Sequence, residues 1–268
     1  MKLKDRVIIV FGGANGIGQA SVLLLAEEGA KIVIADRDVE MAEKIAGILK
    51  DQGKSAIGLA CDASVEDDIK AVIATTVDSY GGIHGLVNCV GVDIVGTVED
   101  TESDLWDRSM EVNLKSVYYS CHYAMPHLKK NGGSIVNISS VQALVPVKGY
   151  AAYATAKGGM ISLTRSMAND FYEFGIRANV ICPGEVETNL GANSKRFEEG
   201  ISDAEKRIDP YRPLESFDTE LRPSRILMPE DIGRVVVFLI SDDSNAMNGH
   251  ELVLDAGYIL NTYNNNKE

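Results

Sequence analysis

The chain has 268 residues, 45% of them hydrophobic and 24% charged, which is long enough to bury one large core. Lys and Arg total 26 against 39 for Asp and Glu, a net charge of -13. This acidic surface predicts no nucleic-acid partner, because it repels phosphate backbones.

Apolar runs of strand length alternate with runs of helix length along the chain. We expect strands at 6–11, 31–36, 55–62, 84–90, 133–139, 175–182 and 250–257. We expect helices at 17–29, 39–53, 66–80, 103–130, 152–172 and 228–241. Short apolar strands separated by helices predict an α/β fold, a parallel sheet of about seven strands with helices on both faces. Because no linker interrupts the pattern, we expect one domain over residues 1–268.

The stretch from Asn189 to Met228 breaks this rhythm, because it is polar and rich in proline. We expect a substrate lid there, at about 189–228, since loops this long in compact domains are often functional. A long surface excursion is the alternative. Its basic residues either meet an anionic group of the substrate or form a solvated helix face; they are Lys195, Arg196, Arg207 and Arg212.

Targeting segments and metal sites are not indicated by the sequence. The apolar run VIIVF after MKLKDR is too short for a signal peptide, and no stretch is long enough to cross a bilayer. The four cysteines lie far apart without a CxxC pair, which predicts free thiols and a cytoplasmic protein; they are Cys61, Cys89, Cys121 and Cys182.

A glycine-rich turn, FGGANGIGQA, joins the first expected strand to the first helix. Gly12, Gly16 and Gly18 allow a tight turn and close approach of the backbone to a pyrophosphate. The amino end of the following helix supplies N–H groups and a positive dipole. This stretch therefore predicts a dinucleotide site.

Asp36 ends the second expected strand, eighteen residues after Gly18. A carboxylate at this position accepts both ribose hydroxyls of adenosine and repels a 2′-phosphate, which favours NAD over NADP. Two alternatives stay open: Asp36 caps a helix, or the adjacent Arg37 pairs with a 2′-phosphate. Asp62, just after the third expected strand, is placed to accept from the adenine amine.

Tyr153 and Lys157 are four residues apart and therefore share one face of a helix, whereas Tyr150 has Ala154 at that spacing. An ammonium about 5 Å from a phenol favours the phenolate by roughly 3 kcal/mol at an effective dielectric of about 20, or about two pKa units. Tyr153 would then serve as an acid and base near neutral pH. Ser140 ends a strand at the sheet edge where ligands bind, although a Tyr–Lys pair at this spacing also arises by chance.

These motifs together resemble the short-chain dehydrogenase/reductase family over nearly the whole chain. The matching segments are GGANGIG at 12–18, Asp36, CD at 61–62, NCVG at 88–91, VNLKS at 112–116, NISS at 137–140, YATAK at 153–157 and ICPGEVET at 181–188. The resemblance implies a Rossmann-type doubly wound sheet, a homotetramer, and reversible hydride transfer between a secondary alcohol carbon and C4 of the nicotinamide.

The family's catalytic tetrad corresponds to Asn113, Ser140, Tyr153 and Lys157. By resemblance, Tyr153 is the general acid and base, Ser140 orients the substrate oxygen, Lys157 lowers the pKa of the tyrosine, and Asn113 holds a water in a proton relay. The expected cofactor site comprises Gly12, Asn15, Gly16, Ile17, Gly18, Asp36, Arg37, Asp62, Ala63, Asn88, Gly91, Tyr153, Lys157, Pro183, Gly184, Val186 and Thr188.

Four residues depart from the family's usual pattern without removing a catalytic group: Phe11, His84, Cys89 and Val90. They affect the expected fine geometry of the cofactor site. His84 stands where Asp is common, and we expect this to weaken a structural contact near the adenine pocket.

Three polar residues flank the expected reacting centre: Asp93, Gln142 and Glu185, with Ser140 and Tyr153 beside them. They favour a hydroxylated substrate, a sugar or polyol, because unpaired buried polar groups are costly. Alternatively these side chains point to solvent or bond the backbone. Two other functions stay open: an NADPH-dependent carbonyl reductase and a nucleotide-binding regulator without turnover.

Overall fold

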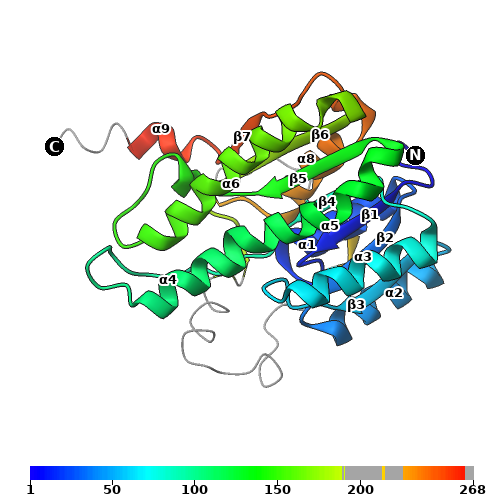
Figure 1. Ribbon diagram of the computed structural model, residues 1–268, viewed down its shortest axis with the longest axis horizontal. Helices are drawn as coiled ribbons and strands as arrows, with labels where there is room; N and C mark the ends of the chain where they lie inside the picture. The colour runs from blue at the N-terminus through cyan, green and yellow to red at the C-terminus, as the bar shows by residue number, and fades with distance from the viewer. Residues whose placement is uncertain (189, 191–212, 215–225, 263–268) are drawn as a thin grey trace.

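The protein is built on one parallel sheet, seen in a computed structural model that describes residues 1–188, 190, 213–214 and 226–262. The strands are β1 (Val7–Phe11), β2 (Lys31–Asp36), β3 (Ala56–Ala60), β4 (Gly85–Asn88), β5 (Gly133–Ile138), β6 (Ile176–Pro183) and β7 (Glu251–Leu254). Their order is β3-β2-β1-β4-β5-β6-β7, and all neighbours are parallel. The expected sheet is confirmed (Figure 1).

Strand β1 shows why these apolar runs form the centre of the sheet. All five residues of VIIVF are buried. Ile8 and Val10 belong to the core on one face, and Ile9 and Phe11 to the core on the other. A strand buried on both faces needs this unbroken apolar run instead of an alternating one.

Helices cover both faces of the sheet, as a doubly wound fold requires (Figure 1). The core of one face includes residues of α1 (Gly16–Glu27), α2 (Val39–Asp51) and α8 (Pro229–Ile240). The core of the other includes residues of α3 (Glu66–Tyr80), α5 (Ser116–Asn131) and α6 (Ala151–Asp170). The short helix α9 (Tyr258–Thr262) follows the last strand.

The expected helix at 103–130 is divided in the structure. It consists of α4 (Ser103–Met110), one π-helical turn at Glu111–Lys115, and α5. Apolar spacing did not reveal the turn, because a single extra residue barely disturbs the pattern. The turn contains Asn113, which is fully buried, and π turns of this kind are frequent at functional sites.

The order of the strands reverses between β1 and β4, because β2 and β3 lie on one side of β1 while β4 to β7 lie on the other. In such sheets ligands bind beyond the carboxyl ends of the strands at this reversal. The expected lid lies almost wholly outside the described residues, as do Lys195, Arg196, Arg207 and Arg212. Within the described part of the chain, no helix is long and apolar enough to span a membrane.

Candidate active site

A cavity of about 680 Å³ opens at the carboxyl ends of the central strands. Residues after β1, β2, β3, β4, β5 and β6 line it, together with residues of α6. Among the expected site residues, those that line it are Gly12, Asn15, Gly16, Ile17, Gly18, Asp36, Arg37, Asp62, Ala63, Gly91, Asp93, Ser140, Gln142, Tyr153, Lys157, Pro183, Gly184, Glu185, Val186 and Thr188. The fold therefore gathers residues that are far apart in the sequence.

The glycine turn forms one wall of the cavity. Gly12 and Gly16 have φ of 73° and 49°, a backbone conformation that favours glycine. A Cβ at Gly18 would lie 1.9 Å from the Gly12 carbonyl oxygen, and one at Gly16 would lie 3.1 Å from Cγ2 of Thr188. Side chains would therefore block the turn or fill the space opposite Thr188. Because the side chain of Asn15 makes no capping bond to α1, that helix end offers amide groups to an anion.

The Asp36 carboxylate is fixed by two backbone amides. Its Oδ2 accepts from the Ala14 N–H at 2.9 Å, and its Oδ1 accepts from the Asp38 N–H at 3.0 Å. Burial raises the pKa of Asp36, while these two hydrogen bonds act in the opposite direction. Each carboxylate oxygen retains acceptor capacity, so the group suits a pair of ribose hydroxyls.

Asp62 and Arg108 line the cavity beside the carboxyl end of β3. Asp62 Oδ1 accepts from the amide and hydroxyl of Ser64. Burial alone would raise the pKa of Asp62, but the Ser64 bonds and nearby guanidinium groups hold it below its usual value. Arg108 reaches the same wall from α4, donating to Ser64 Oγ at 2.7 Å with Nη2 3.9 Å from Asp62 Oδ2. Arg108 was not expected, because only the tertiary fold brings α4 to this loop.

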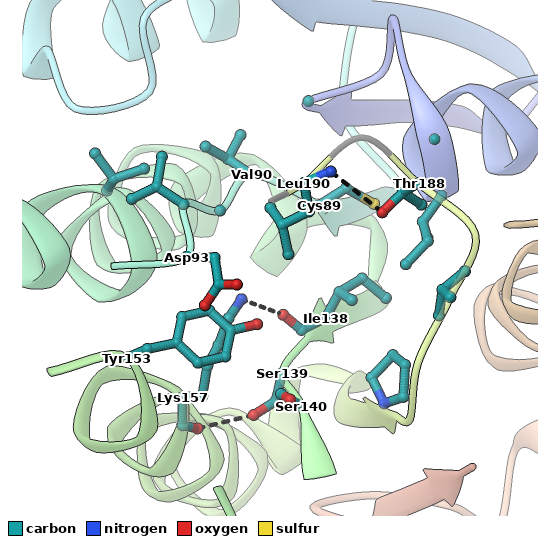
Figure 2. A pocket seen from close by; sticks show the side chains of 18 of the residues that line it. Cys89, Val90, Asp93, Ile138, Ser139, Ser140, Tyr153, Lys157, Thr188 and Leu190 are labelled. Carbon is teal, nitrogen blue, oxygen red and sulfur yellow. Dashed lines mark hydrogen bonds between the residues drawn. The ribbon is translucent and has the colours of Figure 1, made fainter. Parts of the chain in front are cut away.

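Tyr153, Lys157 and Ser140 meet at the other end of the cavity (Figure 2). Their exposed fractions are 6%, 3% and 7%. Lys157 Nζ lies 5.6 Å from the centroid of the Tyr153 ring and donates to the Ile138 carbonyl at 2.9 Å. Ser139 Oγ donates to the Lys157 carbonyl at 2.9 Å, which joins the end of β5 to α6.

The pKa of Tyr153 is raised, although the Tyr–Lys spacing predicted a lowered value. Burial of the phenol is the largest cause, the Asp93 charge adds to it, and the Ser140 side chain opposes it. Burial also lowers the pKa of Lys157 to about 8. For both groups the loss of water is therefore the largest cause of the pKa shift in the protein alone.

Comparison with known proteins identifies the relatives of this chain. Residues 12–259 match a family model described as Enoyl-(Acyl carrier protein) reductase. The chain is 35% identical to 2-(S)-hydroxypropyl-CoM dehydrogenase 3 of Xanthobacter autotrophicus, covering 96% of this chain and 97% of that protein. It is 33% identical to cyclohexanol dehydrogenase of an Acinetobacter species, covering 96% of each. The crystal structure of gox2181 superposes with a TM-score of 0.82 at 30% identity, covering 97% of each chain.

The chain belongs to the short-chain dehydrogenase/reductase family. The expected family and its Rossmann-type doubly wound fold are thereby confirmed. Members of this family use nicotinamide cofactors, and the relatives above are named as dehydrogenases of alcohols.

Two expected site residues of the family pattern, Asn88 and Asn113, do not line the cavity. Asn88 is buried; it donates to Asn137 and accepts from Ser120. Asn113 holds both backbone groups of Val92, accepting from its N–H and donating to its carbonyl at 3.0 Å each. Asn113 thus fixes the backbone of the loop after β4, whereas Asn88 links side chains of β5 and α5.

The departures from the family pattern lie in different places. Cys89 and Val90 line the cavity, and burial raises the pKa of Cys89 to about 12, which keeps the thiol protonated. The expectation for His84 was wrong. Its Nδ1 accepts from the Val7 N–H at 3.1 Å, at the amino end of β1. The cavity lies at the carboxyl ends of the strands, so His84 is far from the expected adenine pocket.

The expected substrate residues of this family member differ in their surroundings. Gln142 Oε1 accepts from the Val147 N–H at 3.0 Å, so this amide holds its own loop. Glu185 is exposed at the rim, where its backbone carbonyl accepts from the Leu227 N–H. Asp93 is partly buried and faces Tyr153 in Figure 2. Tyr150, which helical spacing excluded from the lysine pair, also lines the cavity.

Proposed function

We propose that this protein oxidises a secondary alcohol to a ketone, reversibly, with NAD as the hydride acceptor. The observation that carries the proposal is the position of Tyr153, Lys157 and Ser140 in one cavity with Asp36 and the glycine turn. Relatives named as dehydrogenases of hydroxypropyl-CoM and of cyclohexanol support an alcohol substrate. The polar residues around Tyr153 favour a hydroxylated one, a sugar or polyol.

The residues of the cavity fit a nicotinamide dinucleotide. The N–H groups at the start of α1 would bind the pyrophosphate, and Asp36 would accept the hydroxyls of the adenosine ribose. Lys157 would donate to the nicotinamide ribose, with Val186 and Thr188 beside the carboxamide. Bound NAD would supply the carbon that accepts the hydride. NAD is favoured over NADP because a 2′-phosphate would lie against the Asp36 carboxylate, although Arg37 lines the same wall.

The proton chemistry is assigned to the chain's own residues. Ser140 Oγ accepts from the Gln142 N–H at 3.1 Å, and its own proton, which interacts with the Tyr153 phenol in the protein alone, would turn to the substrate oxygen. In the oxidation, Tyr153 in its phenolate form would take the hydroxyl proton while the carbon gives its hydride to the bound cofactor, and a ketone results. In the reverse direction Tyr153 returns the proton. Because burial raises the pKa of Tyr153, the neutral phenol is ready to donate in ketone reduction.

Two other functions are distinguished by one experiment. Reduction of NAD and of NADP is followed at 340 nm with sugars, polyols, hydroxy acids and steroid alcohols. Turnover with NAD on a hydroxylated alcohol supports the proposal. Turnover only with NADP favours a carbonyl reductase and contradicts the role of Asp36. Tight NADH binding without any turnover favours a nucleotide-binding regulator.

We also propose that the protein is a cytoplasmic homotetramer with one domain, 1–268, and a lid at about 189–228. Exposed aromatic rings on α5 support an interface there: Tyr118 is exposed and its ring centroid lies 5.6 Å from that of Tyr119 and 5.4 Å from that of His122. Light scattering coupled to gel filtration measures the assembly. A monomer in solution would overturn this part of the proposal.

A further inference from the structure

We propose that Asp93 and Tyr150 bind a second hydroxyl of the substrate, on the carbon next to the one that Tyr153 and Ser140 act on. The preferred substrates are then neutral vicinal diols, ahead of simple alcohols and of hydroxy acids. This inference rests on the proposed function. It names Asp93 and Tyr150 as the pair of residues that selects the substrate. Tyr150 is a residue that the motifs did not place in the substrate site.

The backbone that carries Asp93 is rigid. Val92 and Ile94, its neighbours on either side, are buried in a small apolar cluster with Val112. Asn113 holds the backbone of Val92 through two hydrogen bonds. With both neighbours pointing away into the cluster, Asp93 is directed toward the cavity that it lines. Its side chain is therefore held in place before substrate arrives, as a specificity group requires.

The segments that carry Asp93 and Tyr150 are joined by backbone hydrogen bonds. The Gly96 N–H donates to the Gly149 carbonyl at 2.7 Å, and the Ala151 N–H donates to the Gly96 carbonyl at 3.1 Å. The loop after β4 and the start of α6 therefore form one wall. The Tyr150 ring lies edge-on to that of Tyr153, with centroids 6.4 Å apart, so this wall directly adjoins the reacting phenol.

The charge of Asp93 acts on the titratable groups around it in the cavity. The charge of Asp93 is the largest cause of the raised pKa of Tyr150, and it acts on Tyr153 and Lys157 as well. Figure 2 shows the Asp93 carboxylate on the same side of the cavity as the Tyr153 hydroxyl and the Lys157 ammonium. A substrate oxygen held by Tyr153 would bring the adjacent carbon toward Asp93.

The chemistry of this pair selects a hydroxyl. A carboxylate accepts a strong, charge-assisted bond from an alcohol O–H, and a phenol donates to the same oxygen. A substrate carboxylate would be repelled by Asp93. A substrate ammonium would lie near Lys157, whose positive charge opposes it. A simple alcohol would place a carbon atom against Asp93 and Tyr150. These side chains would then lose hydrogen bonds to water without gaining any to the substrate.

Matched alcohols on one carbon skeleton test the inference: cyclohexane-1,2-diol, cyclohexanol and 2-hydroxycyclohexanecarboxylate. For the wild type we expect a kcat/KM about tenfold higher for the diol than for cyclohexanol, and lowest for the acid. Asp93→Ala should reduce this diol preference, the ratio of the two kcat/KM values, about tenfold; an effect of Asp93 on Tyr153 applies to both alcohols and cancels in the ratio. Tyr150→Phe should reduce it several-fold. Glu99→Gln, an exposed carboxylate on the same loop, is the matched control and should change nothing.

Asp93→Asn gives a readout that damage to the fold could not produce. It removes the charge at nearly constant shape, so we expect kcat/KM for the hydroxy acid to rise several-fold relative to that for cyclohexanol, a ratio in which an effect on Tyr153 cancels. If Asp93→Ala does not fold, this gain decides the matter alone. Cyclohexanol turnover without a diol preference, or no gain with the acid, would overturn the inference and leave the proposed function standing. No turnover of any of the three alcohols would overturn both.

Discussion

The two ends of the cavity use different means to hold a ligand. At the proposed adenosine end most groups open to a ligand belong to the backbone or are fixed by it: the glycine turn, the amino end of α1, and the Asp36 carboxylate, which the amides of Ala14 and Asp38 hold. At the proposed reacting end these groups are buried side chains, whose pKa values burial shifts. The first end is set by local chain geometry, whereas the second depends on segments that meet only in the folded protein.

This difference predicts where a single substitution has the largest effect. No other atom replaces a side-chain atom that transfers the proton. A binding surface made of backbone, in contrast, divides its hydrogen bonds to the ligand among several amides. We therefore expect the reacting end to respond by orders of magnitude in rate, and the adenosine end to respond in cofactor choice.

Tyr153→Phe should have the largest effect. Removal of the phenol oxygen beside Lys157 and Ser140 should lower kcat by about 10²- to 10⁴-fold, while NADH still binds. Tyr172→Phe, which changes an exposed tyrosine, is the control. Steady-state kinetics and NADH fluorescence titration measure the two quantities. Full activity in Tyr153→Phe would contradict the assigned acid–base role.

Asp36→Ala should change cofactor choice while the chemistry persists. The loss of two charge-assisted bonds to ribose, and of repulsion toward a 2′-phosphate, should reduce the ratio of kcat/KM for NAD over NADP by about ten- to hundredfold. Asp51→Ala, an exposed carboxylate at the end of α2, is the control. A wild type that already prefers NADP would show that Asp36 does not select the cofactor.

The smallest expected effect is the change that Lys157→Met makes in the pH dependence of the free energy of unfolding. Folding lowers the pKa of Lys157 from 10.5 to about 8, so between these values the unfolded chain binds more protons. The stability contribution of Lys157 therefore rises with pH across that window and is most unfavourable below it. Relative to Lys157→Met, the wild type should gain about 2 kcal/mol between about pH 7 and about pH 9.5.

Urea unfolding of the cofactor-free protein at the two pH values measures this gain. The comparison with Lys157→Met removes the contribution of the cysteines, whose raised pKa values act in the opposite direction. An unchanged difference between the two proteins would mean that Lys157 is not desolvated in solution.

The adenosine end could be read from the sequence because its contacts are local. Gly12 directly follows β1, Gly18 lies in the first turn of α1, and Asp36 ends β2. A strand–turn–helix pattern places all three without further knowledge of the fold. The pairing of Tyr153 with Lys157 follows in the same way from helical spacing. Each of these positions depends on only one or two elements.

Other features could not be predicted from the sequence, because they depend on tertiary burial and long-range contacts. The raised pKa of Tyr153 arises from burial of its phenol among other side chains, which helical spacing does not report. Arg108 reaches Ser64 from a helix more than forty residues away in sequence. The side chain of Asn113 is used by Val92 because a π turn presents it there, and apolar periodicity does not detect such a turn.

The hydrogen bonds between Gly96 and residues 149–151 have a practical consequence for redesign. They make the loop after β4 and the entrance of α6 a single exchangeable unit, although more than fifty residues of sequence separate them. A segment grafted alone from a relative would have a backbone conformation that matches the relative's partner segment. It would not match the partner segment that remains in this protein. Libraries that vary both segments together should therefore yield altered substrate ranges more often than libraries that vary either one alone.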